Sequence, residues 1–163
     1  MTRILNPLLF AVLALVFICS QASAAKDKPD IAGWEKGGAY DKFYDAKEAD
    51  SFKGKVEQII EIVPLPGMAK GVGLVVRDKK DNKTETVHLG PKDFVDVESI
   101  GLRTGDTIKV SGVWATIGGK EVVMASKIKK DEGAELKVRR SKDGTPWWTL
   151  SPEELAQEKK AGN

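Results

Sequence analysis

Apolar and polar residues alternate along most of the chain between residues 52 and 129, and this pattern carries the fold prediction. Five segments show the two-residue period of a half-buried strand, and each is bounded by proline, glycine or a short polar turn. They cover residues 52–63, 71–77, 84–89, 107–115 and 121–129. The adjacent Ile59 and Ile60 predict a bulge or bend in the first segment, and Gly112 predicts a sharp bend in the fourth.

A short helix is predicted between the third and fourth strands. Phe94, Val97 and Ile100 recur at threefold spacing after Gly90-Pro91, which favours a helix that would plug one end of a barrel. The resulting order is three strands, a short helix and two strands. We therefore expect an all-β fold, a five-stranded OB-type barrel over residues 52–130.

Both flanks of this domain carry aromatic residues. Residues 25–51 form an N-terminal arm that should lie across the barrel and bury its aromatic rings, those of Trp34, Tyr40, Phe43 and Tyr44. Residues 131–163 should hold a C-terminal β-hairpin around Asp143-Gly144 and then a short tail helix. Ser151 and Glu154 form the capping box that starts this helix.

Residues 1–24 have the features of a cleavable signal peptide. Arg3 precedes an apolar run over residues 8–18, and Ala22-Ser23-Ala24 provides small residues for cleavage. The run is shorter than the roughly 20 residues of a membrane-spanning helix, so no stable membrane span is expected after cleavage. A retained N-terminal anchor is the alternative.

Export would also remove the only cysteine. Cys19 lies within residues 1–24, so the mature chain would have no disulfide, no thiolate nucleophile and no cysteine-ligated haem or iron–sulfur site. The net charge of the whole sequence is only +2, with acids and bases interleaved. This pattern indicates an ordinary solvated surface, without a polybasic tail.

Several stretches are similar to a family of small secreted OB-fold proteins of proteobacteria, most of them uncharacterised. The stretches are Trp34-Glu35-Lys36-Gly37, Tyr44-Asp45, Phe52-Lys53-Gly54-Lys55-Val56, Val87-His88-Leu89-Gly90-Pro91, Gly105-Asp106-Thr107-Ile108-Lys109-Val110-Ser111-Gly112 and Asp143-Gly144-Thr145-Pro146-Trp147. The resemblance spans most of the mature chain and implies a periplasmic location with a binding or accessory role. Such proteins are sometimes labelled DNA-binding from the fold alone. The resemblance implies no agreed ligand and no catalytic residue.

His88 is the only histidine of the chain. Successive side chains of a strand point to opposite faces, so His88 should lie on the face opposite to Val87 and Leu89. We therefore expect it to point away from the core and to form a hydrogen bond with the neighbouring turn. The alternative is a copper or haem ligand acting with Met68 or Met124, whose sulfur atoms suit Cu(I). Because the chain offers no second histidine and no Cys-x-x-Cys-His spacing, no metal and no cofactor is predicted.

Two further functional classes receive little support. The sequence has no Gly-x-Ser-x-Gly motif for a nucleophilic serine, so no catalytic residue and no enzymatic activity is predicted. OB barrels often bind single-stranded nucleic acids through aromatic side chains on their second and third strands. These two segments contain no aromatic residue, and acids interrupt the cations of residues 77–83. Nucleic-acid or oligosaccharide binding remains the alternative function.

The remaining candidate chemistry is a binding surface. Trp147-Trp148 and Arg139-Arg140 lie across the predicted hairpin, where an arginine over a tryptophan gives a cation–π pair. Such a pair can stack on sugars, dock a protein or simply seal the barrel mouth. The candidate ligand-binding residues are Met68, His88, Trp114, Lys120, Arg139 and Trp147. We expect a non-catalytic periplasmic protein that binds a protein partner or small ligand, with a link to envelope redox or stress systems as a hypothesis.

Overall fold

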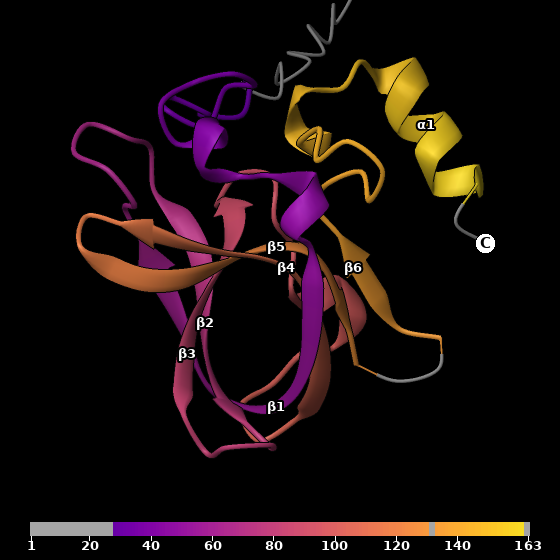
Figure 1. The fold of residues 1–163 in the computed structure, drawn as a ribbon. Coiled ribbons are helices and arrows are strands. Elements are labelled where there is room, and N and C mark those ends of the chain that lie inside the picture. The colour runs from indigo at the N-terminus through magenta and orange to yellow at the C-terminus, as the bar shows by residue number, and fades with distance from the viewer. Residues whose placement is uncertain (1–27, 131–132, 162–163) are drawn as a thin grey trace, which may run out of the picture.

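The computed structural model describes residues 28–130 and 133–161, so the predicted signal peptide lies outside the described residues. These form an all-β structure with one α-helix near the C-terminus (Figure 1). The strands are β1 (Asp50–Ile62), β2 (Gly71–Asp78), β3 (Thr84–Pro91), β4 (Thr107–Ile117), β5 (Lys120–Lys129) and β6 (Glu135–Lys137). The helices are the 3-10 helices η1 (Asp41–Phe43), η2 (Ala46–Glu48), η3 (Glu98–Ile100) and η4 (Trp147–Thr149), and the α-helix α1 (Pro152–Ala161).

All five predicted strands are confirmed, with ends within two residues of the expected ones. They belong to one sheet with the order β3-β2-β1-β4-β5-β6, in which neighbours are antiparallel. A further parallel pairing joins β3 to β5 at Val87–Val123 and His88–Met124. The pairings of β1 to β5 therefore return to their starting point and form a ring (Figure 1).

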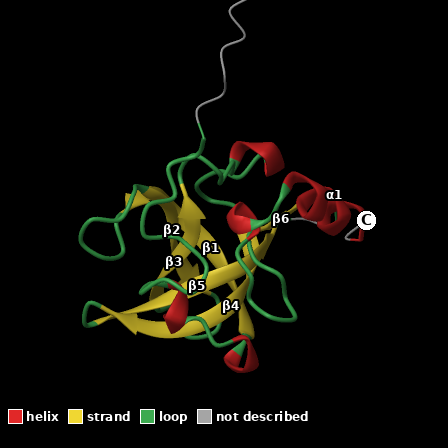
Figure 2. Ribbon diagram, turned by 90° about the horizontal axis from the view of Figure 1, so that it is seen from above, coloured by secondary structure: helices red, strands yellow, loops and turns green. Residues whose placement is uncertain are grey.

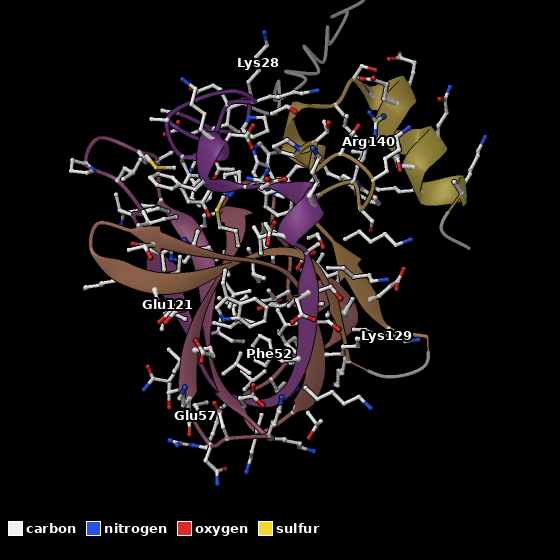
Figure 3. The ribbon with its side chains drawn as sticks, viewed as in Figure 1. Lys28, Phe52, Glu57, Glu121, Lys129 and Arg140 are labelled. Carbon is white, nitrogen blue, oxygen red and sulfur yellow. The ribbon has the colours of Figure 1, made fainter. Side chains whose placement is uncertain are left out.

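The apolar side chains of the alternating pattern fill this ring. Phe52 lies inside it (Figure 3). The most deeply buried strand residues include Val56, Leu74, Val76, Val87, Leu89, Ile108, Val110, Val113, Val123 and Ile128. Burial of a side chain of this size contributes about 1.5–3 kcal/mol to folding, so the ring interior is the main source of stability.

The register of β4 against β5 shifts between Ser111 and Gly112, where Ser126 of β5 is the extra, unpaired residue. The bend predicted in β4 at Gly112 therefore stays a prediction. The predicted bulge at Ile59 and Ile60 is wrong. The register of β1 shifts instead between Val56 and Gln58. Ile59 is 40% exposed, so the two isoleucines do not both need burial and the ladder continues through them.

The connection from β3 to β4 contains the expected short helix, in the 3-10 form of η3. Threefold spacing matches the three residues per turn of a 3-10 helix. Phe94, Val97 and Ile100 pack partly buried against the core. The more deeply buried residues here are Val95 and Leu102.

The N-terminal arm crosses one end of the strand ring (Figure 1). Trp34 and Tyr40 are buried there as predicted, with ring centroids 4.7 Å apart, and Tyr44 is partly buried. The burial predicted for Phe43 is wrong, since its side chain is 40% exposed. The Trp34 ring also packs edge-to-face against the ring of Trp148 from the C-terminal segment, with ring centroids 5.9 Å apart. The arm thus packs on the ring and on the C-terminal segment together.

The predicted C-terminal hairpin needs correction. Its first part, β6, pairs with β5 and extends the main sheet, because β5 has a free edge where its pairing with β3 ends. A single bridge, Arg139–Pro146, then closes the loop. The Asp143-Gly144 turn is confirmed, with Gly144 at a positive φ of 73°.

The tail helix α1 lies to one side of the strands (Figure 2). Its capping box is confirmed, since the Glu154 amide donates to Ser151 Oγ at 3.2 Å and the Ser151 amide donates to Glu154 Oε2 at 2.9 Å. Within the described residues, no helix has the length and hydrophobicity needed to cross a membrane.

Candidate binding site

The predicted ligand-binding residues do not gather at one place. Met68 lies against Gly33 of the arm, and His88 contacts the arm at Tyr40. Trp114 packs beside Phe52 with ring centroids 5.6 Å apart, while Lys120 is exposed at the start of β5. Arg139 and Trp147 line one pocket together. The other four predicted residues do not line it.

The surroundings predicted for His88 are wrong. Its side chain is buried rather than outward-facing, because the arm covers this face of β3. Nδ1 lies 3.2 Å from the Tyr40 hydroxyl, so the hydrogen-bond partner belongs to the arm and not to the neighbouring turn. Burial lowers the pKa of His88 to about 4 and raises the pKa of Tyr40. The two groups therefore form a neutral hydrogen-bonded pair near pH 7.

The two methionines considered beside His88 differ in position. Met124 is its direct register partner across the β3–β5 pairing and is buried in the core. Met68 is only partly buried and lies in the loop after β1. Among the described residues, no group of three or more histidine, cysteine, aspartate or glutamate side chains could hold a metal ion.

Arg139 connects the C-terminal segment to the arm. Its Nη1 donates to Asp41 Oδ1 at 2.6 Å and to the Gly144 carbonyl at 2.9 Å. The guanidinium lies 4.6 Å from the centroid of the Tyr44 ring and 5.3 Å from that of Trp148. The predicted arginine–tryptophan pair is therefore confirmed at Trp148, and a second ring from the arm joins it.

Trp147 is the first residue of η4 and is buried. Its backbone amide donates to the Val138 carbonyl at 2.9 Å, which fixes the ring position relative to β6. Its indole Nε1 has no hydrogen-bond partner within the described part of the chain, and the same holds for Nη2 of Arg139. The indole groups of Trp34 and Trp148 are both bonded, to the carbonyls of Ala69 and Trp34.

Two hollows meet at Trp147. The smaller has a volume of about 300 Å³ and is lined by both arginines and by Lys142. The larger, of about 850 Å³, extends to Phe94 and to Leu155 of α1. Lys137, Trp147 and Glu158 line both. Figure 3 shows Arg140 beside α1, and its Nε donates to Glu158 of that helix. The two hollows together form the candidate binding site.

Sequence reasoning missed the contacts that assemble this region. Tyr40 bonds His88 across 48 residues, and Asp41 bonds Arg139 across 98. No local pattern marks such partners. A weaker signal was present for α1, where Glu154 and Glu158 follow one another at the four-residue spacing that places two acids on one helix face.

The described structure defines a small all-β protein in which the strand ring has a filled core and the candidate binding site lies beside the C-terminal segment. The chain belongs to the MamS/MamX magnetosome protein family, whose model matches residues 48–134. The match covers β1 to β5, with Met68, His88, Trp114 and Lys120, whereas Arg139 and Trp147 lie beyond it. Comparisons with curated proteins and with solved structures gave no match.

Proposed function

We propose that this protein is a non-catalytic binding or accessory protein that holds a protein partner or small ligand at the two hollows beside Trp147. The observation that carries the proposal is the position of Trp147, a large ring between two hollows with a hydrogen-bond donor unpaired in the described chain. Trp147 borders both hollows although it is largely buried, and an aromatic ring with an unpaired N–H group at the wall of a hollow suits recognition.

The framework that carries this site is, in this proposal, an OB-type barrel. The support is the circular order of pairings, in which β3 meets β5 in parallel after β1 has paired with both β2 and β4. OB barrels use their framework for binding through loops and attached segments. The short η3 between β3 and β4 fits the same architecture.

The proposed place of action is the periplasm, after removal of residues 1–24. Support comes from the apolar run over residues 8–18 and the Ala22-Ser23-Ala24 site. The family name adds a cellular setting, since it refers to magnetosomes. We therefore expect the partner or ligand among the contents of the cell envelope and of magnetosome fractions. A contribution to envelope redox or stress systems stays a hypothesis within this setting.

The test is affinity capture with the whole chain, expressed from its own start codon with a C-terminal tag so that its own processing can occur. The tagged protein is used to capture ligands from envelope and magnetosome extracts, and the bound proteins and small molecules are identified by mass spectrometry. Trp147→Phe removes the indole N–H and keeps an aromatic ring. Trp114→Phe is the matched control, because Trp114 packs beside Phe52 away from the hollows.

The proposal predicts a retained protein or small molecule that is reduced with Trp147→Phe and unchanged with Trp114→Phe. Thermal unfolding of all three proteins verifies that the variants are folded. Absence of any retained species would contradict a binding function. Equal retention by all three proteins would show that the hollows beside Trp147 are not the site.

A further inference from the structure

We propose that the smaller hollow is a binding site for a small oxyanion, a carboxylate or phosphate group. It is called the basic pocket below and is defined by Arg139, Arg140, Lys142 and Trp147. The inference rests on the proposed function, because it concerns part of the same site, and it names the chemical class of the ligand. Three independent observations carry it.

The first observation is the charge of the lining. Four cationic residues, Lys137, Arg139, Arg140 and Lys142, line this volume of about 300 Å³ together with a single acid, Glu158. The whole sequence has 26 basic and 24 acidic residues, so this concentration of cations does not follow from overall composition. A hollow in which one sign of charge predominates attracts ligands of the opposite sign.

The second observation is the pair of unbonded donors. Within the described chain, Arg139 Nη2 and Trp147 Nε1 are buried and make no hydrogen bond, and the Arg139 side chain is only 2% exposed. Buried polar groups in folded proteins are nearly always paired. Both groups can only donate, so the partner that completes them must be an acceptor.

The third observation concerns which cations of the lining already form ion pairs with nearby acids. Asp41 pairs with Arg139 through Nη1, and Arg140 pairs with Glu158 through Nε and more weakly with Glu154, at 3.9 Å, through Nη2. Lys137 pairs with Glu135 at 2.9 Å. Lys142 has no ion pair among the described residues. The described chain thus leaves two buried donors without a partner and one exposed cation, Lys142, without an ion pair. An anionic acceptor bound at this lining would bond such donors more strongly than a neutral one and would be attracted by the charge of Lys142.

Glu158 gives the proposal a distinguishing consequence. Its carboxylate already occupies one edge of the basic pocket, bonded to Arg140 Nε, and it comes from α1, a helix with no buried residue. A carboxylate therefore fits this lining, and a second anion must compete with it for Arg140. Removal of the Glu158 charge should strengthen binding of an added anion, which no neutral ligand would require.

The test uses the ¹⁵N-labelled protein, titrated with sodium phosphate and separately with sodium acetate, while sodium chloride keeps the ionic strength constant. The indole N–H signals of the tryptophans are followed, and Trp147→Phe identifies the signal of Trp147. We expect a saturable shift of the Trp147 signal and little change for Trp34, whose indole is bonded to Ala69. Tighter binding of phosphate than of acetate would assign a phosphate-type ligand, and the reverse order a carboxylate.

Three variants sharpen this titration. Lys142→Gln should weaken binding about threefold, as expected for the loss of one exposed charge contact. Glu158→Gln should strengthen it by a similar factor of about three. Lys80→Gln is the control, because Lys80 is exposed in the turn between β2 and β3 and does not line the pocket. It should leave the affinity unchanged.

The proposal is overturned if neither anion gives a saturable shift, or if chloride alone produces the same one. It is also overturned if Lys142→Gln and Lys80→Gln behave alike. A failed titration alongside Trp147-dependent capture from extracts would remove the anion site and leave the proposed binding function. A successful titration with no captured species would support the anion site and remove the proposed binding of a partner or ligand from the extracts.

Discussion

At the scale of single residues, buried polar contacts fix the two flanking segments onto the strand ring. Tyr40 meets His88, Asp41 meets Arg139, and the Trp148 indole donates to the Trp34 carbonyl at 2.7 Å. Each contact joins parts of the chain that are far apart in sequence. Loss of one partner would leave a buried group unsatisfied, which costs about 1–3 kcal/mol.

His88 should make the stability of the protein depend on pH. Burial lowers its pKa from 6.5 to about 4 in the folded state. Between these values the unfolded chain binds a proton that the folded chain does not, so stability falls as the pH falls from about 6.5 to about 4. The total loss from this group is about 3 kcal/mol.

This prediction is tested with His88→Gln, which does not titrate. Urea unfolding at pH 7 and at pH 4.5 should show that wild type loses about 2–3 kcal/mol more than the variant. Contributions of the carboxylates are common to both proteins and cancel in the comparison. An equal loss in wild type and variant would contradict the buried, neutral state of His88.

The contacts of single residues were also the part of the structure that the sequence predicted least well. The alternation of side chains along the strand placed His88 on the face opposite to Val87 and Leu89. It could not show that the arm covers the face on which His88 lies. The pairing of Arg139 with a tryptophan followed from residue type, whereas its ion pair with Asp41 spans 98 residues. Long-range polar partners leave no periodic signal in the chain.

At the scale of elements, the strands were predictable because alternation of apolar residues expresses directly which face meets the core. The exceptions have physical reasons. β6 joined the free edge of β5 instead of pairing within its own hairpin, and pairing between strands is not encoded by the pattern of one strand. The bulge of β1 at Glu57 rather than Ile59 likewise depends on the register with β2.

Gly112 is the element-scale feature with the sharpest consequence. A Cβ at this position would lie 2.2 Å from the Met124 carbonyl oxygen, a backbone atom that cannot move without disturbing β5. Gly112→Ala should therefore destabilise the protein by at least about 2 kcal/mol. The measurement is the urea concentration at the midpoint of unfolding.

Gly133→Ala serves as the control for this comparison. No atom lies within 4 Å of a Cβ at Gly133, so its effect should stay within about 0.5 kcal/mol. Equal midpoints for the two variants would show that β4 and β5 do not approach each other as closely as the structure has them at Gly112.

At the scale of the whole molecule, the strand ring contains the buried apolar core and the flanking segments supply the candidate site. The ring closes through β3 and β5, and the arm and the C-terminal segment meet each other over its end through Trp34 and Trp148. The order of elements made a closed fold predictable. The meeting of the two flanks was not, and neither were the hollows beside Trp147, because they depend on how α1 and β6 are placed.

The central claim is that a partner or ligand binds at Trp147, and the indole signals of the labelled protein test it directly. On addition of envelope and magnetosome extract, the account predicts that the Trp147 indole signal shifts or broadens while that of Trp34, already bonded to Ala69, stays in place. An unchanged Trp147 signal, with changes at Trp114 instead, would contradict the claim and move the binding surface to the strand ring.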